Sequence, residues 1–187
     1  MKCEVCKSTV QEIFLKKILG TYIKDSKGKK HKGLLFTVPD QKKAEAYILK
    51  AKDNLLLCNL YKEKRFDYKI PEEWYYTMYY CALAILAKFG VESRNQRCTA
   101  LFLRAVTEKG ITAISSDFLD HITVHGDKDE ISSVDEREQA RYGASIQSEE
   151  IMAKYDTMMN LCKQYISEME EIVYSDKDFI VPKELLK

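Results

Sequence analysis

The chain has 187 residues, of which 45% are apolar and 32% are charged, a balance typical of a soluble globular protein rather than a disordered one. Its 30 basic and 29 acidic residues leave a net charge of +1, which argues against wide binding of duplex nucleic acid. No apolar run approaches the length of a membrane span, and the Met-Lys-Cys start lacks the apolar core of a signal peptide. Six cysteines without such a signal predict a cytoplasmic protein with reduced thiols.

Residues 1–39 differ in pattern from the rest of the chain and are predicted to be a separate N-terminal segment ahead of a body at 40–187. Two apolar runs, 13–23 and 34–38, flank a turn that contains Asp25, Ser26 and Gly28. This arrangement predicts a short β-hairpin.

The same segment opens with a Cys-x-x-Cys pair, Cys3 and Cys6, and over Met1–His31 it resembles a small zinc ribbon. Ribbons hold zinc with two such pairs, because a tetrahedral site needs four ligands. No second pair follows His31 here. Cys3, Cys6 and His31 could hold a metal only with a fourth ligand from elsewhere in the chain or from a second chain. We therefore expect sub-stoichiometric zinc and no other cofactor.

From Gln41 onward the spacing of the apolar residues becomes helical. The stretch 41–64 predicts a first helix, with lysines on its outer side. The residues expected on its inward face are Ala44, Tyr47, Ala51, Leu55 and Cys58.

A second helix is predicted to begin near Pro71, a residue suited to a first helical turn, and to end at Gly90 as a left-handed cap. Its apolar residues from Trp74 to Phe89 cover so wide a face that it should be the central helix of a bundle. We interpret its aromatic run as core packing rather than as a ligand box, because no phosphate-binding glycines lie nearby.

A third helix is predicted after a loop at 91–95, with Cys98, Leu101, Phe102 and Ala105 inward and Gly110 at its end. A shorter helix at about 115–124, a helical piece at 134–143 and a long last helix capped by Ser148 follow. No strand pattern appears after residue 40. The predicted fold is all-α, an up-and-down bundle of five or six helices preceded by the short β-hairpin.

Three motifs occur in order along the helical body: the aromatic run Tyr75–Tyr79 with Gly90, the polar stretch Ser93–Thr99, and an Arg-x-x-Ala-x-Tyr element at Arg137–Tyr142. Together they resemble the HEPN superfamily of small helical bundles, which occur in toxin–antitoxin, antiviral and RNA-processing systems. The resemblance covers about residues 42–174. It implies a homodimer whose polar loops face each other across a cleft, and we expect the helices carrying Tyr75–Phe89 and Gln96–Val106 to form its interface.

In the nuclease branch of that superfamily, an arginine followed by a polar residue and later by a histidine cleaves RNA without metal. Arg94 and Asn95 match the start of this motif, but Thr99 stands at the usual histidine position. Gln96 stands where a related branch carries its histidine. Neither threonine nor glutamine exchanges a proton near neutral pH, so the general acid–base partner is missing.

Two other histidines, His121 and His125, are the remaining catalytic candidates. Each could approach the cleft within the fold or across a dimer, and each could equally be a surface histidine.

Arg94 and Arg97 have two competing interpretations. They could pair with acidic neighbours such as Glu92, or they could form a phosphate clamp with the amides of the following helix start. The residues predicted to bind RNA or a nucleotide are Arg94, Asn95, Gln96, Arg97 and Arg137.

Three functions remain open from the sequence. The first and favoured one is a protein that binds RNA or a nucleotide without catalysis, as the partner of a nucleotidyltransferase in a toxin–antitoxin or defence-type system. The second is a metal-independent ribonuclease with a displaced histidine. The third is a structural dimerisation module with the N-terminal hairpin as its interaction arm.

Overall fold

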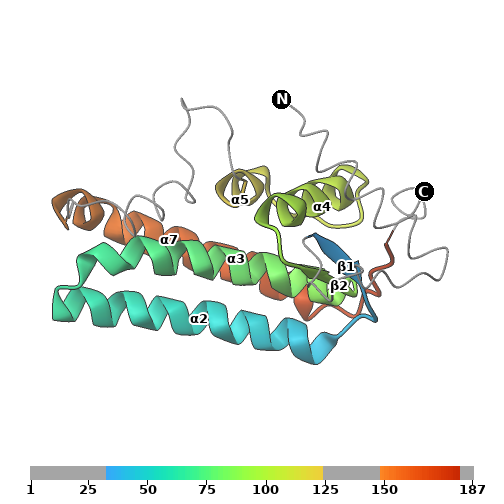
Figure 1. Cartoon of the computed structure of the whole chain (residues 1–187), viewed down its shortest axis with the longest axis horizontal. Coiled ribbons are helices and arrows are strands. Elements are labelled where there is room, and N and C mark those ends of the chain that lie inside the picture. Colours follow the sequence, from blue (N-terminus) through green and yellow to red (C-terminus); the bar gives the residue numbers. More distant parts are fainter. Residues whose placement is uncertain (1–32, 124–147, 182–187) are drawn as a thin grey trace, which may run out of the picture.

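A computed structural model of the chain describes residues 33–123 and 148–181, and these form five helices and a small two-stranded sheet (Figure 1). The long helices are α2 (Gln41–Lys64), α3 (Ile70–Lys88) and α7 (Ser148–Val173). Two shorter helices are α4 (Gln96–Glu108) and α5 (Ser116–His121), and η1 (Asp67–Lys69) is a single 3-10 turn between α2 and α3. None of these helices is long and apolar enough to cross a bilayer. The predicted N-terminal metal ligands and the helical piece at 134–143 lie outside the described residues.

The three long helices pack side by side, which confirms the predicted helical body at this level of detail. Their ends meet near Lys88, whose ammonium donates to the carbonyl of Val173 at 2.8 Å and to the side chain of Gln41 at 2.9 Å. The start of α2 therefore lies beside the ends of α3 and α7. It follows that α2 runs antiparallel to α3, whereas α3 and α7 run in the same direction (Figure 1).

The sheet corrects the prediction of an all-α body without strands. β1 (Leu34–Phe36) pairs antiparallel with β2 (Val91–Ser93), with Leu34 opposite Ser93 and Phe36 opposite Val91. The part of the predicted hairpin that is described thus pairs with a strand beyond α3. A three-residue strand is too short to show the alternation by which strands are recognised in sequence.

Strand β1 belongs to the same core as the helices, because the side chains of Leu34 and Phe36 are buried among helical residues. The proposed segment boundary at residue 39 therefore does not separate β1 from the helical body. Whether residues 1–32 form a unit of their own remains a prediction.

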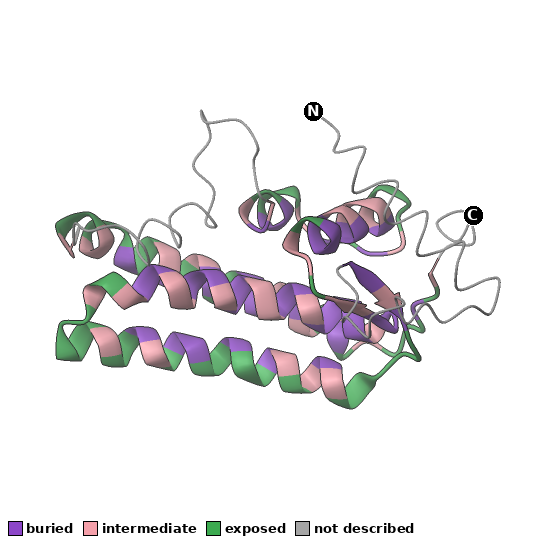
Figure 2. Ribbon diagram, viewed as in Figure 1, coloured by how far each residue is buried: buried purple, intermediate pink, exposed green. Residues whose placement is uncertain are grey.

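The central helix is α3, as its wide apolar face predicted, and its residues are buried or partly buried, with none exposed (Figure 2). Trp74, Met78, Cys81 and Ile85 lie in the core, so the aromatic run is a packing element at these positions. Because α2, α4, α7 and β2 all contact α3, the chain itself covers the face that we expected a dimer to bury. The homodimer remains a prediction, but α3 does not offer it a wide open surface.

Helix α4 confirms Cys98 and Phe102 as buried, but its inward face is turned relative to the predicted one. Leu101 and Ala105 were expected to point inward but are only partly buried. The buried residues of this helix are Cys98, Thr99, Ala100, Phe102, Leu103 and Val106. Leu101 and Ala105 each lie one residue too early along the helix. Small and apolar residues occur on both sides of the buried face, so their spacing alone did not fix which face points inward.

Two further details of the helical assignment change. Helix α5 is shorter than predicted and ends at His121. Ser148, the predicted cap of the last helix, is the first described residue of α7, and its hydroxyl donates to the Asp67 carboxylate at 2.8 Å. This hydrogen bond ties the start of α7 to the turn between α2 and α3.

Gly90 ends α3 in the left-handed conformation that the sequence predicted, with φ +68°. The chain that leads from β1 to α2 passes directly over it. The Thr37 amide donates to the Gly90 carbonyl at 2.6 Å, and the Asp40 amide donates to the Ala87 carbonyl at 3.0 Å. Asp40 then caps α2 by accepting from the Lys43 amide.

The four cysteines of the described chain are free and buried, and we expect them to be unreactive in the folded protein. Burial raises the pKa of the Cys162 thiol to about 12 and raises those of Cys58 and Cys81 further. Since the thiolate is the reactive form, a disulfide reagent at pH 8 should modify none of them before unfolding. The measurement uses a variant with serine at both Cys3 and Cys6, titrated with and without guanidinium. Rapid labelling of the folded variant would contradict the buried positions.

Candidate functional site

The predicted site lies at the junction of β2 and α4, where Asn95 is the N-cap of the helix. Its side-chain oxygen accepts a hydrogen bond from the Cys98 amide at 3.1 Å, and its backbone is extended. Ser93 donates to the Asn95 carbonyl at 2.9 Å and accepts from the Asn95 amide. Asn95 therefore has a structural role that explains it without any ligand.

Thr99, which stands at the expected histidine position, is part of the same network. Its hydroxyl lies 2.7 Å from the Ser93 hydroxyl and 3.1 Å from the Asn95 carbonyl, and the residue is only 1% exposed. A buried hydroxyl held in this way cannot exchange protons with a substrate near neutral pH. This position is therefore structural.

Tyr79 of α3 lies beneath this junction. Burial raises the pKa of its hydroxyl, and hydrogen bonding to Thr99 and Ser93 offsets part of that rise. Tyr79 thus stays neutral at physiological pH and links the middle of α3 to the first turn of α4.

Arg94 and Arg97 are both exposed, and neither guanidinium makes a hydrogen bond or ion pair within residues 33–123 and 148–181. The backbone amide of Arg94 donates to the Gly33 carbonyl at 3.2 Å, which fixes the start of the loop against the strand that enters the sheet. Glu92, the acidic neighbour predicted as a partner, forms its ion pair with Lys43 of α2 instead. The structural interpretation of these arginines therefore lacks its expected partner.

The first turn of α4 contains no acidic residue, in contrast to the first turns of α3, α5 and α7. The positive end of the α4 dipole is therefore not balanced by its own sequence. Gln96 lies in this turn and is partly exposed, and Arg97 lies beside it. A helix dipole that no acidic residue of its first turn balances, together with two exposed guanidinium groups, is a feature of an anion-binding helix start.

His121 lies in a separate cluster formed by α5 and α7. Its Nδ1 is 2.9 Å from the Asp117 carbonyl and 3.0 Å from the Tyr165 hydroxyl, and that hydroxyl donates to the Asp117 carboxylate. The tyrosine proton is thus committed to Asp117, so Nδ1 carries a proton and donates to both oxygens. The Nε2 atom makes no hydrogen bond within residues 33–123 and 148–181, and the side chain is 28% exposed.

Tyr165 holds this cluster in place. The residue is fully buried, and burial together with its hydrogen bond to Asp117 raises the pKa of its hydroxyl far above the ordinary value. It therefore stays neutral and acts as a fixed support for the imidazole.

The structure brings Arg94, Asn95, Gln96 and Arg97 together at one helix start. None of the contacts of His121 within the described chain involves these four residues; its partners come from α5 and α7. The other predicted site residues lie outside the described residues: His125, Arg137, Cys3, Cys6 and His31. Within residues 33–123 and 148–181, no group of three or more histidine, cysteine or acidic side chains is placed to hold a metal ion.

Sequence reasoning missed a group of partly exposed tyrosines next to this helix start. Tyr76, Tyr79 and Tyr80 lie on the strip of α3 that reaches the surface, although the whole aromatic run was assigned to the core. Their spacing of three and four positions placed them on one helix face, which was the available signal. No model of a known protein family matches the chain, and no curated protein sequence matches it.

Proposed function

We propose that the chain is a HEPN-like protein that binds RNA or a nucleotide by its phosphate groups at the N-terminus of α4. One observation carries the proposal: Arg94 and Arg97 are exposed and unpaired within the described chain, next to a helix start without acidic residues. A phosphate bound there meets the positive end of the helix dipole and two planar donors that can each bind two oxygens. The sequence resemblance places its polar loop at the same residues.

Four other cations of the described chain support this assignment by contrast, because each has a partner within the fold. Arg94 and Arg97 are therefore distinguished from basic residues that serve the fold. The paired cations are Lys43 with Glu92, Lys52 with Glu170, Arg104 with Asp120, and Lys88 with the carbonyls of Val173 and Ser175.

The proposed activity is binding without cleavage. Thr99 is buried and hydrogen-bonded at the position where a nuclease would carry its histidine, and Gln96 cannot take its place. The protein would then act as the partner of a nucleotidyltransferase, as a homodimer whose two α4 starts share one ligand cleft.

A second candidate, the metal-independent ribonuclease, is favoured by one feature. The Nδ1 atom of His121 is held by Asp117 and Tyr165, which orients the ring in the manner of a catalytic base held by its neighbours. In this hypothesis, His121 of one chain would face Arg94 across a dimer cleft.

Charge removal at the two arginines tests the phosphate site. Arg94→Gln and Arg97→Gln should each weaken binding of a labelled single-stranded RNA by about 10- to 150-fold, because a charge-assisted contact is worth about 1.5–3 kcal/mol. The slope of log K against the logarithm of the salt concentration should become shallower by about 0.7 for each lost phosphate contact. Fluorescence anisotropy at several salt concentrations measures both quantities.

The matched control is Lys163→Gln, which removes one exposed charge from α7 and should leave binding unchanged. Thermal unfolding should be unaffected in all three variants, since these side chains are exposed. Unchanged binding in both arginine variants would contradict the phosphate site and leave the structural dimerisation module as the remaining hypothesis. RNA cleavage in the presence of a chelator, lost in Arg94→Gln and in His121→Ala, would establish the ribonuclease.

A further inference from the structure

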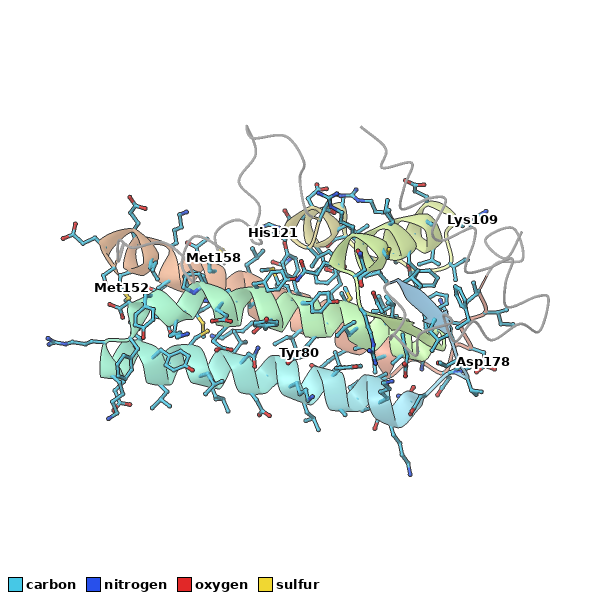
Figure 3. All side chains as sticks on the ribbon, viewed as in Figure 1. Tyr80, Lys109, His121, Met152, Met158 and Asp178 are labelled. Atoms are coloured by element: carbon cyan, nitrogen blue, oxygen red, sulfur yellow. The ribbon has the colours of Figure 1, made fainter. Side chains whose placement is uncertain are left out.

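The strip of α3 that reaches the surface is aromatic. Tyr76, Tyr79 and Tyr80 are partly exposed along it, and Tyr47 of α2 stacks against Tyr80 with ring centroids 6.1 Å apart and an interplanar angle of 19°. The ring centroid of Tyr76 in turn lies 6.1 Å from that of Tyr80. Tyr80 is seen between α2 and α3 in Figure 3. We refer to Tyr47, Tyr76, Tyr79 and Tyr80 as the tyrosine row.

One end of the tyrosine row adjoins the proposed phosphate site. The Tyr79 hydroxyl hydrogen-bonds with Ser93 and Thr99, which precede and follow the two unpaired arginines in the sequence. The Tyr79 end of the row therefore lies at the segment that carries the two arginines.

The other end of the row carries a second cation. The Lys50 ammonium lies 5.6 Å from the centre of the Tyr80 ring and 5.9 Å from that of Tyr47. The path from Arg94 over Tyr79, Tyr80 and Tyr47 to Lys50 thus has positive charge at both ends. In contrast, Tyr76 lies one turn from Glu72 and Glu73, so a polyanion would avoid that end of the row.

We infer that Tyr79, Tyr80 and Tyr47 of the tyrosine row form a base-stacking surface for single-stranded RNA whose backbone is held by Arg94, Arg97 and Lys50. This inference rests on the proposed phosphate site and extends it from a single phosphate to a strand of several nucleotides. Aromatic rings with flanking cations are the arrangement by which proteins bind single strands without reading their sequence, since every base has a stacking face. A duplex keeps its bases stacked on one another and cannot use such a surface.

The test compares an octanucleotide of uridine with uridine monophosphate. Tyr80→Leu and Tyr47→Leu should each weaken binding of the octanucleotide by about 5- to 150-fold, the range of one stacked base. Binding of the mononucleotide and the salt dependence should stay unchanged, because no phosphate contact is lost. Tyr80→Phe keeps the ring and should bind as the wild type does. The control Tyr68→Leu removes an exposed tyrosine that also has a lysine over its ring, but at the turn between α2 and α3.

A readout on the wild-type protein avoids any effect of the variants on folding. An oligonucleotide that carries 2-aminopurine should lose fluorescence on binding, because stacking on tyrosine quenches that base. Loss of octanucleotide affinity in Arg94→Gln but in neither leucine variant would overturn the stacking surface and leave the phosphate site intact. Failure of the wild type to bind either ligand would overturn both, and equal affinity for a duplex would overturn the stacking surface alone.

Discussion

Gly90→Ala is expected to destabilise the protein by about 2–5 kcal/mol, from two causes that add. The left-handed backbone conformation, φ +68°, costs a residue with a side chain about 1–2 kcal/mol. A Cβ at this position would also lie 2.6 Å from the Pro39 nitrogen and 2.7 Å from the Thr37 carbonyl oxygen. Both atoms belong to the backbone that connects β1 to α2, so they can move only if the sheet moves, at a further cost of about 1–3 kcal/mol.

Gly110→Ala is the matched control for this prediction. Gly110 has nearly the same backbone conformation, φ +69°, but a Cβ there meets no atom within 4 Å. The Gly110→Ala variant should therefore lose only the stability that the left-handed backbone conformation costs, about 1–2 kcal/mol. Urea denaturation of the two variants measures the difference. Equal losses would show that the crossing over Gly90 is looser than the structure indicates.

Leu86→Ala should cost about 2–5 kcal/mol of stability, because it empties space in the core. Leu86 is fully buried in the last turns of α3, the central helix of the fold. The removed methyl groups lose their contacts, and the surrounding helices can close the gap only in part. Chemical denaturation with an unchanged m-value would attribute the whole effect to stability.

Leu83→Ala makes the same chemical change on the same helix, on the strip that is partly exposed. Helix propensity cancels between the two variants, so their difference reports burial alone. We expect Leu83→Ala to cost about 1 kcal/mol or less. A loss as large as that of Leu86→Ala would mean that something covers this strip in solution, and a second copy of the chain would then be the first explanation to test.

The long helices could be predicted from sequence because their signals are local and repeated. The bounds 41–64 for α2 agree with the structure, and α3 follows from Pro71, from its wide apolar face and from Gly90. The inward face of α2 was harder, because leucines also occupy its outer side. Leu49, Leu56 and Leu60 are exposed, whereas Ile48 is buried next to them. When apolar residues occupy both faces of a helix, their positions alone do not show which face is buried.

The sheet and the surroundings of His121 could not be predicted, because their partners are distant in sequence. The register between β1 and β2 depends on how α3 packs against α2 and brings β2 beside β1. No local sequence pattern encodes that packing. His121 is oriented by Tyr165 of α7, which lies 44 residues further along the chain. For the candidate site, the sequence placed Arg94 and Arg97 correctly at a helix start. It could not show that Asn95 and Thr99 serve the fold there.

The sheet also has a consequence for the order in which the chain folds. β1 and β2 are separated in sequence by the whole of α2 and α3, so pairing them in a disordered chain would require the closure of a long loop. Once α2 and α3 have packed as an antiparallel pair, the two strands are brought within reach and that entropic cost is already met. We therefore expect strand pairing to follow helix pairing and to come after the main folding barrier. Substitutions in the strands should then change the rate at which the protein unfolds more than the rate at which it folds.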